Sequence, residues 1–122
     1  MLKIGEYTRI NGKIGKVKDI VLNSNNYEDS GIYLENEKFI LGKEEIYKLK
    51  SSYNIIDLIG VGDYVNGYKV LDILKGFKIL VDKLELNTRD GNYYLKQFAN
   101  NEIKSVVTEE VFKANEYRVE AN

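Results

Sequence analysis

Two similar segments constrain the fold of this chain more than any other feature. Residues 4–20 read IGEYTRINGKIGKVKDI, and residues 61–73 read VGDYVNGYKVLDI. Both open with an apolar residue, a glycine, an acidic residue and a tyrosine, reach an Asn-Gly pair, and end in Lys-Val-x-Asp-Ile. An Asn-Gly pair between alternating residues is the strongest local signal for a tight β-hairpin. The two segments therefore predict two equivalent hairpins.

A second pair of matches follows in the same order. Residues 38–48 read KFILGKEEIYK, and residues 104–113 read KSVVTEEVFK. Each contains an apolar run, a residue suited to begin a helix (Gly42 or Thr108) and two glutamates, which favour the first turn of a helix because of its dipole. Two matches in one order favour an internal duplication, with convergent turn chemistry as the alternative.

The first segment follows the pattern x-Gly-acidic-aromatic and then Gly-x-x-Gly-x-Val-x-x-Ile, which resembles the start of a KOW-type, SH3-like barrel. Four residues stand at the matching positions: Gly12, Gly15, Val17 and Ile20. The second segment has no counterpart of Gly15. The resemblance implies that the glycines permit a sharp turn and close backbone approach, while alternating Val and Ile face a small barrel core.

These patterns predict a mainly β chain, a β-rich α+β fold of two tandem small SH3-like barrel units related by internal duplication, each ending in a short helical turn. We expect the first barrel-like repeat over 1–52 and the second over 61–122. The junction over 53–60 is apolar, so we expect the halves to pack together as one compact unit. Further hairpins are expected at Lys75-Gly76 and Asp90-Gly91. Short helical turns are expected over 43–49, 54–59 and 109–114.

The composition argues against the common catalytic chemistries. Among its 122 residues the chain has no cysteine and no histidine, so no disulfide, thiolate metal site, or Ser-His or Cys-His nucleophile can form. The adjacent glutamates Glu44-Glu45 and Glu109-Glu110 are interpreted as solvated residues of first helical turns. The polar stretch 23–29 does not match the spacing of a calcium loop. We predict a non-enzymatic chain with no cofactor and no metal.

No segment is long and apolar enough to predict a membrane span, and the N-terminus does not read as a secretory signal. We therefore expect a cytoplasmic protein. The VGDYVNG core at 61–67 and the VVTEEVF ending at 106–112 resemble those of small uncharacterised proteins from phages and prophages of low-GC Gram-positive bacteria. That resemblance implies an accessory phage gene acting in the host cytoplasm. Such proteins often bind and block a host protein, including defence machinery, in the manner of an anti-CRISPR protein.

The chain is unusually rich in tyrosine, with ten tyrosines and no tryptophan. A tyrosine combines a large apolar face with a polar handle, which suits binding surfaces. Tyr93 and Tyr94 must point to opposite faces of a strand, so at most one of them is buried. We predict that Arg89, Tyr93 and Tyr94 contact a host protein, because aromatic residues and arginine dominate protein interfaces.

The alternative function is a KOW-like nucleic-acid-binding module that uses the basic first hairpin. Its candidate residues are Tyr7, Arg9, Lys13, Lys16 and Lys18. Such a patch offers cations to phosphates and an aromatic ring to a base. The net charge of −1 and the pI of about 5.6 argue against it. A virion or assembly protein is a further alternative, and the sequence does not specify an oligomeric state.

Overall fold

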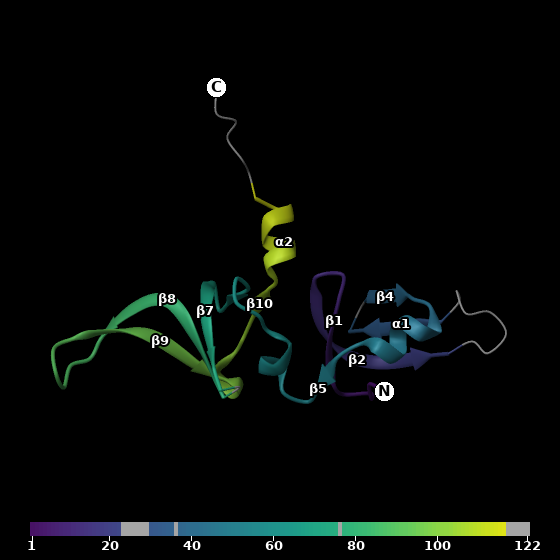
Figure 1. Cartoon of the computed structure of the whole chain (residues 1–122), viewed down its shortest axis with the longest axis horizontal. Helices are drawn as coiled ribbons and strands as arrows, with labels where there is room; N and C mark the ends of the chain where they lie inside the picture. Colours follow the sequence, from purple (N-terminus) through teal and green to yellow (C-terminus); the bar gives the residue numbers. More distant parts are fainter. Residues whose placement is uncertain (23–29, 36, 76, 117–122) are drawn as a thin grey trace, which may run out of the picture. The chain divides into compact units, whose positions relative to one another are not determined.

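The computed structural model describes residues 1–22, 30–35, 37–75 and 77–116; the stretch 23–29 considered for calcium lies outside them. The chain divides into two compact units, Met1–Leu58 and Ile59–Asn122. Each unit is built on one antiparallel five-stranded sheet (Figure 1), which confirms the mainly β prediction. No helix in these described ranges has the length and apolar character to cross a membrane. That the two halves pack together stays a prediction.

The first unit is a meander whose last strand pairs with its first, in the order β4-β3-β2-β1-β5. Its strands are rich in β-branched and aromatic residues that alternate with polar ones, as suits a sheet with one buried face. A bulge between Val17 and Asp19 shifts the register of the second strand. The strands are β1 (Tyr7–Ile10), β2 (Lys13–Val21), β3 (Gly31–Leu34), β4 (Glu37–Ile40) and β5 (Ser51–Ser52).

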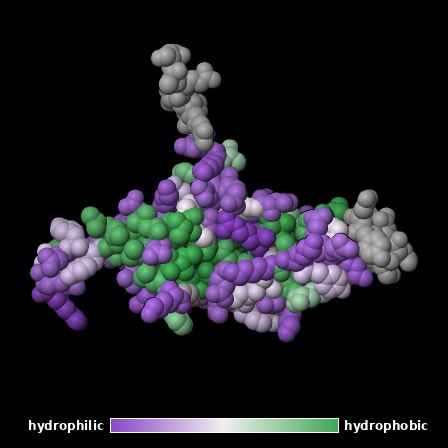
Figure 2. All heavy atoms as spheres, in the orientation of Figure 1, coloured by the Kyte–Doolittle hydropathy of each residue, from purple (hydrophilic) through white to green (hydrophobic). Residues whose placement is uncertain are grey.

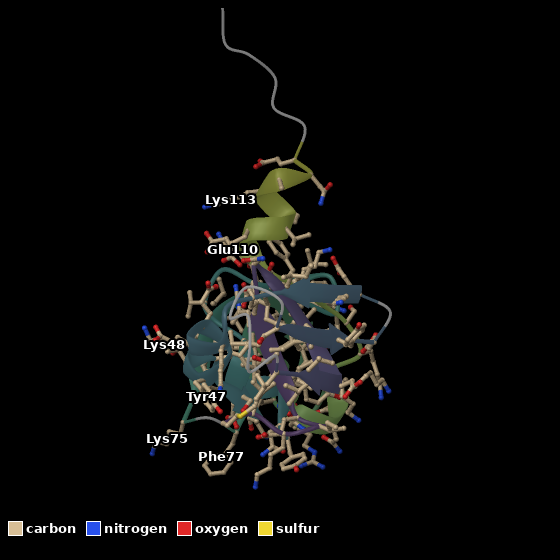
Figure 3. The ribbon with its side chains drawn as sticks, turned by 90° about the vertical axis from the view of Figure 1, so that its right-hand side faces the viewer. Tyr47, Lys48, Lys75, Phe77, Glu110 and Lys113 are labelled. Atoms are coloured by element: carbon tan, nitrogen blue, oxygen red, sulfur yellow. The ribbon has the colours of Figure 1, made fainter. Side chains whose placement is uncertain are left out.

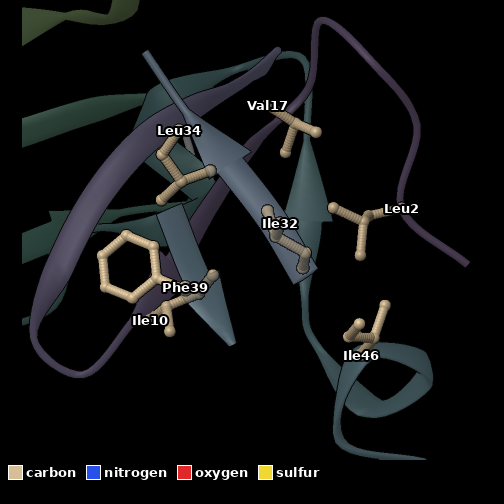
Figure 4. Close-up of a cluster of buried hydrophobic side chains, with 7 residues drawn as sticks. All are labelled: Leu2, Ile10, Val17, Ile32, Leu34, Phe39 and Ile46. Atoms are coloured by element: carbon tan, nitrogen blue, oxygen red, sulfur yellow. The ribbon is translucent and has the colours of Figure 1, made fainter. Parts of the chain in front are cut away.

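One face of this sheet packs against helix α1 (Lys43–Lys48), which begins after the predicted cap Gly42. Val17, Ile32 and Ile46 have no exposed surface. Complete burial of such a side chain stabilises the fold by about 1.5–3 kcal/mol. Figure 4 shows the whole cluster: Leu2, Ile10, Val17, Ile32, Leu34, Phe39 and Ile46.

The second unit repeats the strand order, β10-β6-β7-β8-β9, so its last strand also pairs with its first. Its core includes Val65, Val70, Ile79 and Val81, all without exposed surface. The strands are β6 (Tyr64–Val65), β7 (Tyr68–Leu74), β8 (Lys78–Leu86), β9 (Tyr93–Ala99) and β10 (Val106–Val107).

Three further helical elements complete the two units. A 3-10 turn, η2 (Ile55–Leu58), ends the first unit, and η3 (Asn100–Glu102) follows β9. Helix α2 (Glu109–Ala114) begins after Thr108, whose side chain accepts a hydrogen bond from the Val111 backbone, as predicted for its cap. The ring of Phe112 stacks on Tyr64 with 4.0 Å between centroids and so fixes α2 against β6.

Both Asn-Gly hairpins are confirmed. Asn11 and Gly12 have φ of 50° and 78°, and Asn66 and Gly67 have 52° and 86°. Two positive φ values are what a type I′ turn requires, and few residues other than Asn and Gly adopt them readily. These turns join β1 to β2 and β6 to β7.

Backbone hydrogen bonds beside the two hairpins correspond. In the first unit Val17 N–H donates to the Glu6 carbonyl at 2.8 Å, and Gly5 N–H donates to Val17 at 2.9 Å. In the second unit Val70 N–H donates to Asp63 at 2.7 Å, and Gly62 N–H donates to Val70 at 3.0 Å. The first pair of similar segments therefore occupies equivalent places in the two sheets.

The second pair of matches does not occupy equivalent places, which corrects that part of the prediction. Residues 38–48 cover the fourth strand of the first sheet and a helix that precedes the fifth. Residues 104–113 cover the fifth strand of the second sheet and a helix that follows it. The closed barrel is also not seen: within the described ranges the terminal strands of each sheet do not pair with each other.

Besides the two Asn-Gly hairpins, the structure contains one hairpin that was not predicted and two that were. β3 and β4 are joined at Glu35, which has φ of 50° although glutamate is not a usual turn residue. One strand, β8, takes part in both of the further hairpins that the sequence predicts, since it pairs with β7 on one edge and with β9 on the other. Figure 3 shows Lys75 and Phe77 projecting from the turn between β7 and β8, where a hairpin was predicted.

Candidate protein-binding surface

The second sheet has two chemically different faces. We call the face with Ile79 and Phe98 the inner face, because both side chains are buried there opposite each other. The opposite face is the outer face. Side chains alternate between faces along a strand, and directly paired residues share a face. The register therefore assigns the paired residues of β8 and β9 to one of these two faces, on either side of a register shift between Leu80 and Leu84.

The outer face of the β8–β9 hairpin is apolar and exposed. Leu84 pairs with Leu95, and Leu86 pairs with Tyr93, so all four side chains lie on it. Leu84, Leu86 and Tyr93 are 64%, 52% and 64% exposed. Figure 2 shows hydrophobic side chains gathered over β7, β8 and β9. Single exposed leucines are ordinary, but a contiguous apolar patch is typical of an interaction surface.

The inner face is polar over the same length of hairpin. Glu85 pairs with Tyr94 there, and the Lys96 ammonium lies 3.2 Å from the Glu85 carboxylate. The Lys83 ammonium lies 4.0 Å from the same carboxylate and 4.8 Å from the centroid of Tyr68. A hydrogen bond with the Tyr68 hydroxyl raises the pKa of Lys83. Two lysines thus share one glutamate on this face.

The turn between β8 and β9 holds the predicted arginine. Arg89 is exposed, and its backbone N–H donates to the Asn87 side chain at 2.9 Å. The Tyr94 hydroxyl donates to the Asp90 carboxylate at 2.6 Å, and this bond lowers the pKa of Asp90. Tyr94 is therefore tied to the turn, while its neighbour Tyr93 lies on the apolar face.

The structure thus separates the three residues predicted to bind protein. Tyr93 joins an apolar patch, Tyr94 belongs to the polar inner face, and Arg89 occupies the turn. Sequence reasoning missed Leu84, Leu86 and Leu95. The signal for the two leucines of β8 is a change of pattern along the strand: residues 79–81 are all apolar, whereas apolar residues then occupy only positions 84 and 86, on either side of Glu85.

The five residues predicted for the alternative nucleic-acid site do not all lie on one face of the first sheet. Tyr7 pairs with Lys16 and Arg9 pairs with Ile14, so Tyr7, Arg9 and Lys16 share the face opposite the core. The Lys16 ammonium lies 5.6 Å from the Tyr7 centroid. The Arg9 guanidinium donates to the Leu58 carbonyl at 3.1 Å. These three residues form a small basic and aromatic surface.

Lys13 and Lys18 do not join that surface. Lys13 pairs with the buried Ile10, and its ammonium contacts the Glu37 carboxylate at 2.8 Å. Lys18 is exposed at the bulge of β2. A second pair lies on the same face of the first sheet, opposite its core, which we call the outer face of that sheet. It was not predicted: the Lys38 ammonium lies 5.3 Å from the Tyr33 centroid.

Within residues 1–22, 30–35, 37–75 and 77–116, no group of three or more acidic residues is placed so that it could hold a metal ion. Asp63 is the one fully buried acidic residue of this described part. Its two oxygens accept backbone hydrogen bonds from Gly60 at 2.7 Å and from Glu109 at 2.8 Å. This geometry makes Asp63 a link between the start of β6 and the first turn of α2.

Comparison with known proteins gives no relative for this chain: no family model, no curated protein and no solved structure matches it.

Proposed function

We propose that this chain is a non-enzymatic protein-binding module whose contact surface is the outer face of the β8–β9 hairpin. The observation that carries the proposal is the polarity of the hairpin, which exposes leucines and a tyrosine while its inner face is charged. Apolar surface is stabilising only where it leaves water, so a contiguous exposed apolar face is favourable where a partner covers it.

The partner we propose is a host protein, and the function we propose is inhibition of a host process, including a defence system in the anti-CRISPR manner. This part is supported by the resemblance of residues 61–67 and 106–112 to small phage and prophage proteins. It is also supported by the near-neutral charge, because a strongly charged chain would favour nucleic acid or membrane surfaces.

The test is capture of the partner from host lysate by tagged protein, with and without nuclease, read by mass spectrometry. Tyr93→Ser and Tyr94→Ser form a matched pair, because both tyrosines are exposed but lie on opposite faces. We expect Tyr93→Ser to weaken capture about 30-fold or more, as loss of an aromatic anchor does. Tyr94→Ser should leave it nearly unchanged. Equal effects of the two substitutions would contradict the proposal.

A second candidate function is binding of single-stranded nucleic acid by the outer face of the first sheet. It is supported by the two cross-strand pairs Tyr7–Lys16 and Tyr33–Lys38, in which a cation and an aromatic ring lie together. Aromatic platforms flanked by cations hold single strands by stacking and by phosphate contacts.

A labelled oligothymidine tests this second function by fluorescence anisotropy. With about three phosphate contacts, affinity should fall by roughly an order of magnitude between low and physiological salt. Lys16→Ala should weaken binding, whereas Lys13→Ala should not, because Lys13 lies on the other face and pairs with Glu37. Affinity that is insensitive to salt, or equal for the two variants, would exclude it.

We also propose that the two units arose by internal duplication of an SH3-like meander. The shared strand order and the corresponding hydrogen bonds around the Asn-Gly hairpins support this. The segments 38–48 and 104–113 lie at different places in the two sheets, so they do not support the duplication. Its support is the pair of hairpins and the shared strand order. An experimental structure in which those hairpins and fifth strands do not superpose residue by residue would contradict it.

A further inference from the structure

The free edge of β9 has the length and chemistry to receive another strand. β9 ends the strand order of its sheet, so no described strand pairs with its second edge. It has seven residues, whereas the edge strands β4, β5 and β10 have four, two and two. Long edge strands invite pairing with another chain and are usually shortened, charged or bulged to prevent it. β9 carries one charge, Lys96.

The pattern of backbone hydrogen bonds shows which groups face that edge. Asn87 N–H donates to the Asn92 carbonyl at 2.8 Å, which is one of the two bonds that a hydrogen-bonded pair of an antiparallel ladder makes. Such pairs alternate with non-bonded pairs along an antiparallel ladder. Leu86–Tyr93 and Leu84–Leu95 are therefore non-bonded pairs. The N–H and C=O groups of Tyr93 and Leu95 consequently point away from β8, toward the free edge.

We propose that β9 binds an extended segment of a partner protein by strand addition. This inference rests on the proposed function and specifies its partner. The segment would pair with Tyr93 and Leu95 through its backbone and would place apolar side chains beside them on the outer face. On the inner face it would place an acidic residue beside Lys96. Lys83 and Lys96 share the carboxylate of Glu85 there, which leaves one positive charge in this group of three for the acidic residue to meet; the Asp90 carboxylate belongs to the turn, where the Tyr94 hydroxyl donates to it.

The probe that tests strand addition is the capped hexapeptide Thr-Val-Glu-Val-Thr-Val, added at about millimolar concentration to isotope-labelled full-length protein. We expect the amides of Tyr93 and Leu95 to exchange with solvent at least about tenfold more slowly in the complex. The amide of Tyr94, which faces β8, should not change. A peptide of the same composition with its three valines adjacent should give no protection, because it cannot alternate its faces.

Two further comparisons sharpen the test. Leu95→Pro removes the N–H at the free edge but spares the ladder to β8, since proline is tolerated at such edge positions. Leu95→Ala removes the same side chain and keeps the N–H. Strand addition requires the proline variant to bind the peptide at least about tenfold more weakly than the alanine variant. Replacing the peptide's glutamate by lysine should weaken binding about two- to fivefold.

The outcomes separate this inference from the proposed function. Peptide contacts on the outer face without protection of the Tyr93 and Leu95 amides, or no binding of the peptide at all, would overturn strand addition. If capture of the host partner still depended on Tyr93 and not on Tyr94, the proposed function would stand. If capture did not depend on Tyr93 either, the hairpin would lose its assigned role.

Discussion

Asp63 has a buried carboxylate, and a substitution can test whether this carboxylate stabilises the fold or serves a catalytic site. Buried acidic groups are frequent at catalytic sites. Asp63 is only 1% exposed, yet its two oxygens accept from backbone N–H groups at 2.7 and 2.8 Å. Its carboxylate also lies at the start of α2, where a negative charge is favourable. The structure therefore assigns it to stability.

Asp63→Ala leaves two backbone donors without their acceptor. Each unsatisfied donor costs about 1–3 kcal/mol when water is excluded. Gly60 and Glu109 are both partly exposed, so water can replace part of the loss. We therefore expect a loss of about 2–3 kcal/mol in the free energy of unfolding. Asp63→Asn keeps one strong acceptor oxygen and should lose about half as much.

Urea unfolding and amide exchange measure both quantities. The Phe112 amide, which donates to the Thr108 carbonyl inside α2, should lose protection in Asp63→Ala. Asp57→Ala is the control, because Asp57 is exposed and should cost less than about 1 kcal/mol. A loss below about 1 kcal/mol in Asp63→Ala, with α2 still protected, would refute the assignment.

Two other predictions follow from local geometry. The Tyr94 hydroxyl lowers the pKa of Asp90, so the bond contributes stability above the unfolded pKa of Asp90 and loses it as the pH falls through the lower folded value. Tyr94→Phe should raise the pKa of Asp90 toward its ordinary value in a carboxyl NMR titration; an unchanged titration would contradict this. A Cβ added at Gly15 would lie 3.0 Å from the Leu34 Cβ, so Gly15→Ala should destabilise the first unit by about 1–3 kcal/mol in urea unfolding. A neutral result would mean that β3 moves aside freely.

Turn and cap chemistry accounts for most of what could be predicted from the sequence. Asn11-Gly12 and Asn66-Gly67 specify their turns because the required φ values suit few other residues. Thr108 specifies the start of α2 because its side chain satisfies a backbone donor. Such signals act within a few residues, so they can be read without knowledge of the rest of the chain.

Relations between distant residues could not be predicted in the same way. The likeness of residues 38–48 to 104–113 is local, whereas their place in each sheet depends on which strand returns to pair with the first. Glu35 adopts positive φ because β3 and β4 pair on either side of it, a constraint that outweighs its weak turn preference. The basic residues of the first hairpin were likewise predicted as one group, although the pairing puts Lys13 and Lys16 on opposite faces.

The buried apolar residues in the first half of β8 point inward, and the exposed leucines in its second half point outward. This leads to a last prediction, that the first group is needed for folding and the second for binding. Ile79 and Val81 point inward and have no exposed surface, whereas Leu84 and Leu86 point outward and are more than half exposed. A lysine at either inward position would bury an unpaired charge, so we expect Ile79→Lys and Val81→Lys to abolish folding.

Leu84→Lys and Leu86→Lys place the same charge in water, so we expect each to change the free energy of unfolding by less than about 1 kcal/mol while abolishing partner capture. The four variants, displayed on cells and stained for fold-dependent expression and for partner binding, separate the two effects. If the outward variants lost expression together with binding, the leucines would belong to the core of the folded protein. If they lost neither, the apolar face of this hairpin would not be the contact surface, and the polarity of β8 would need a different cause.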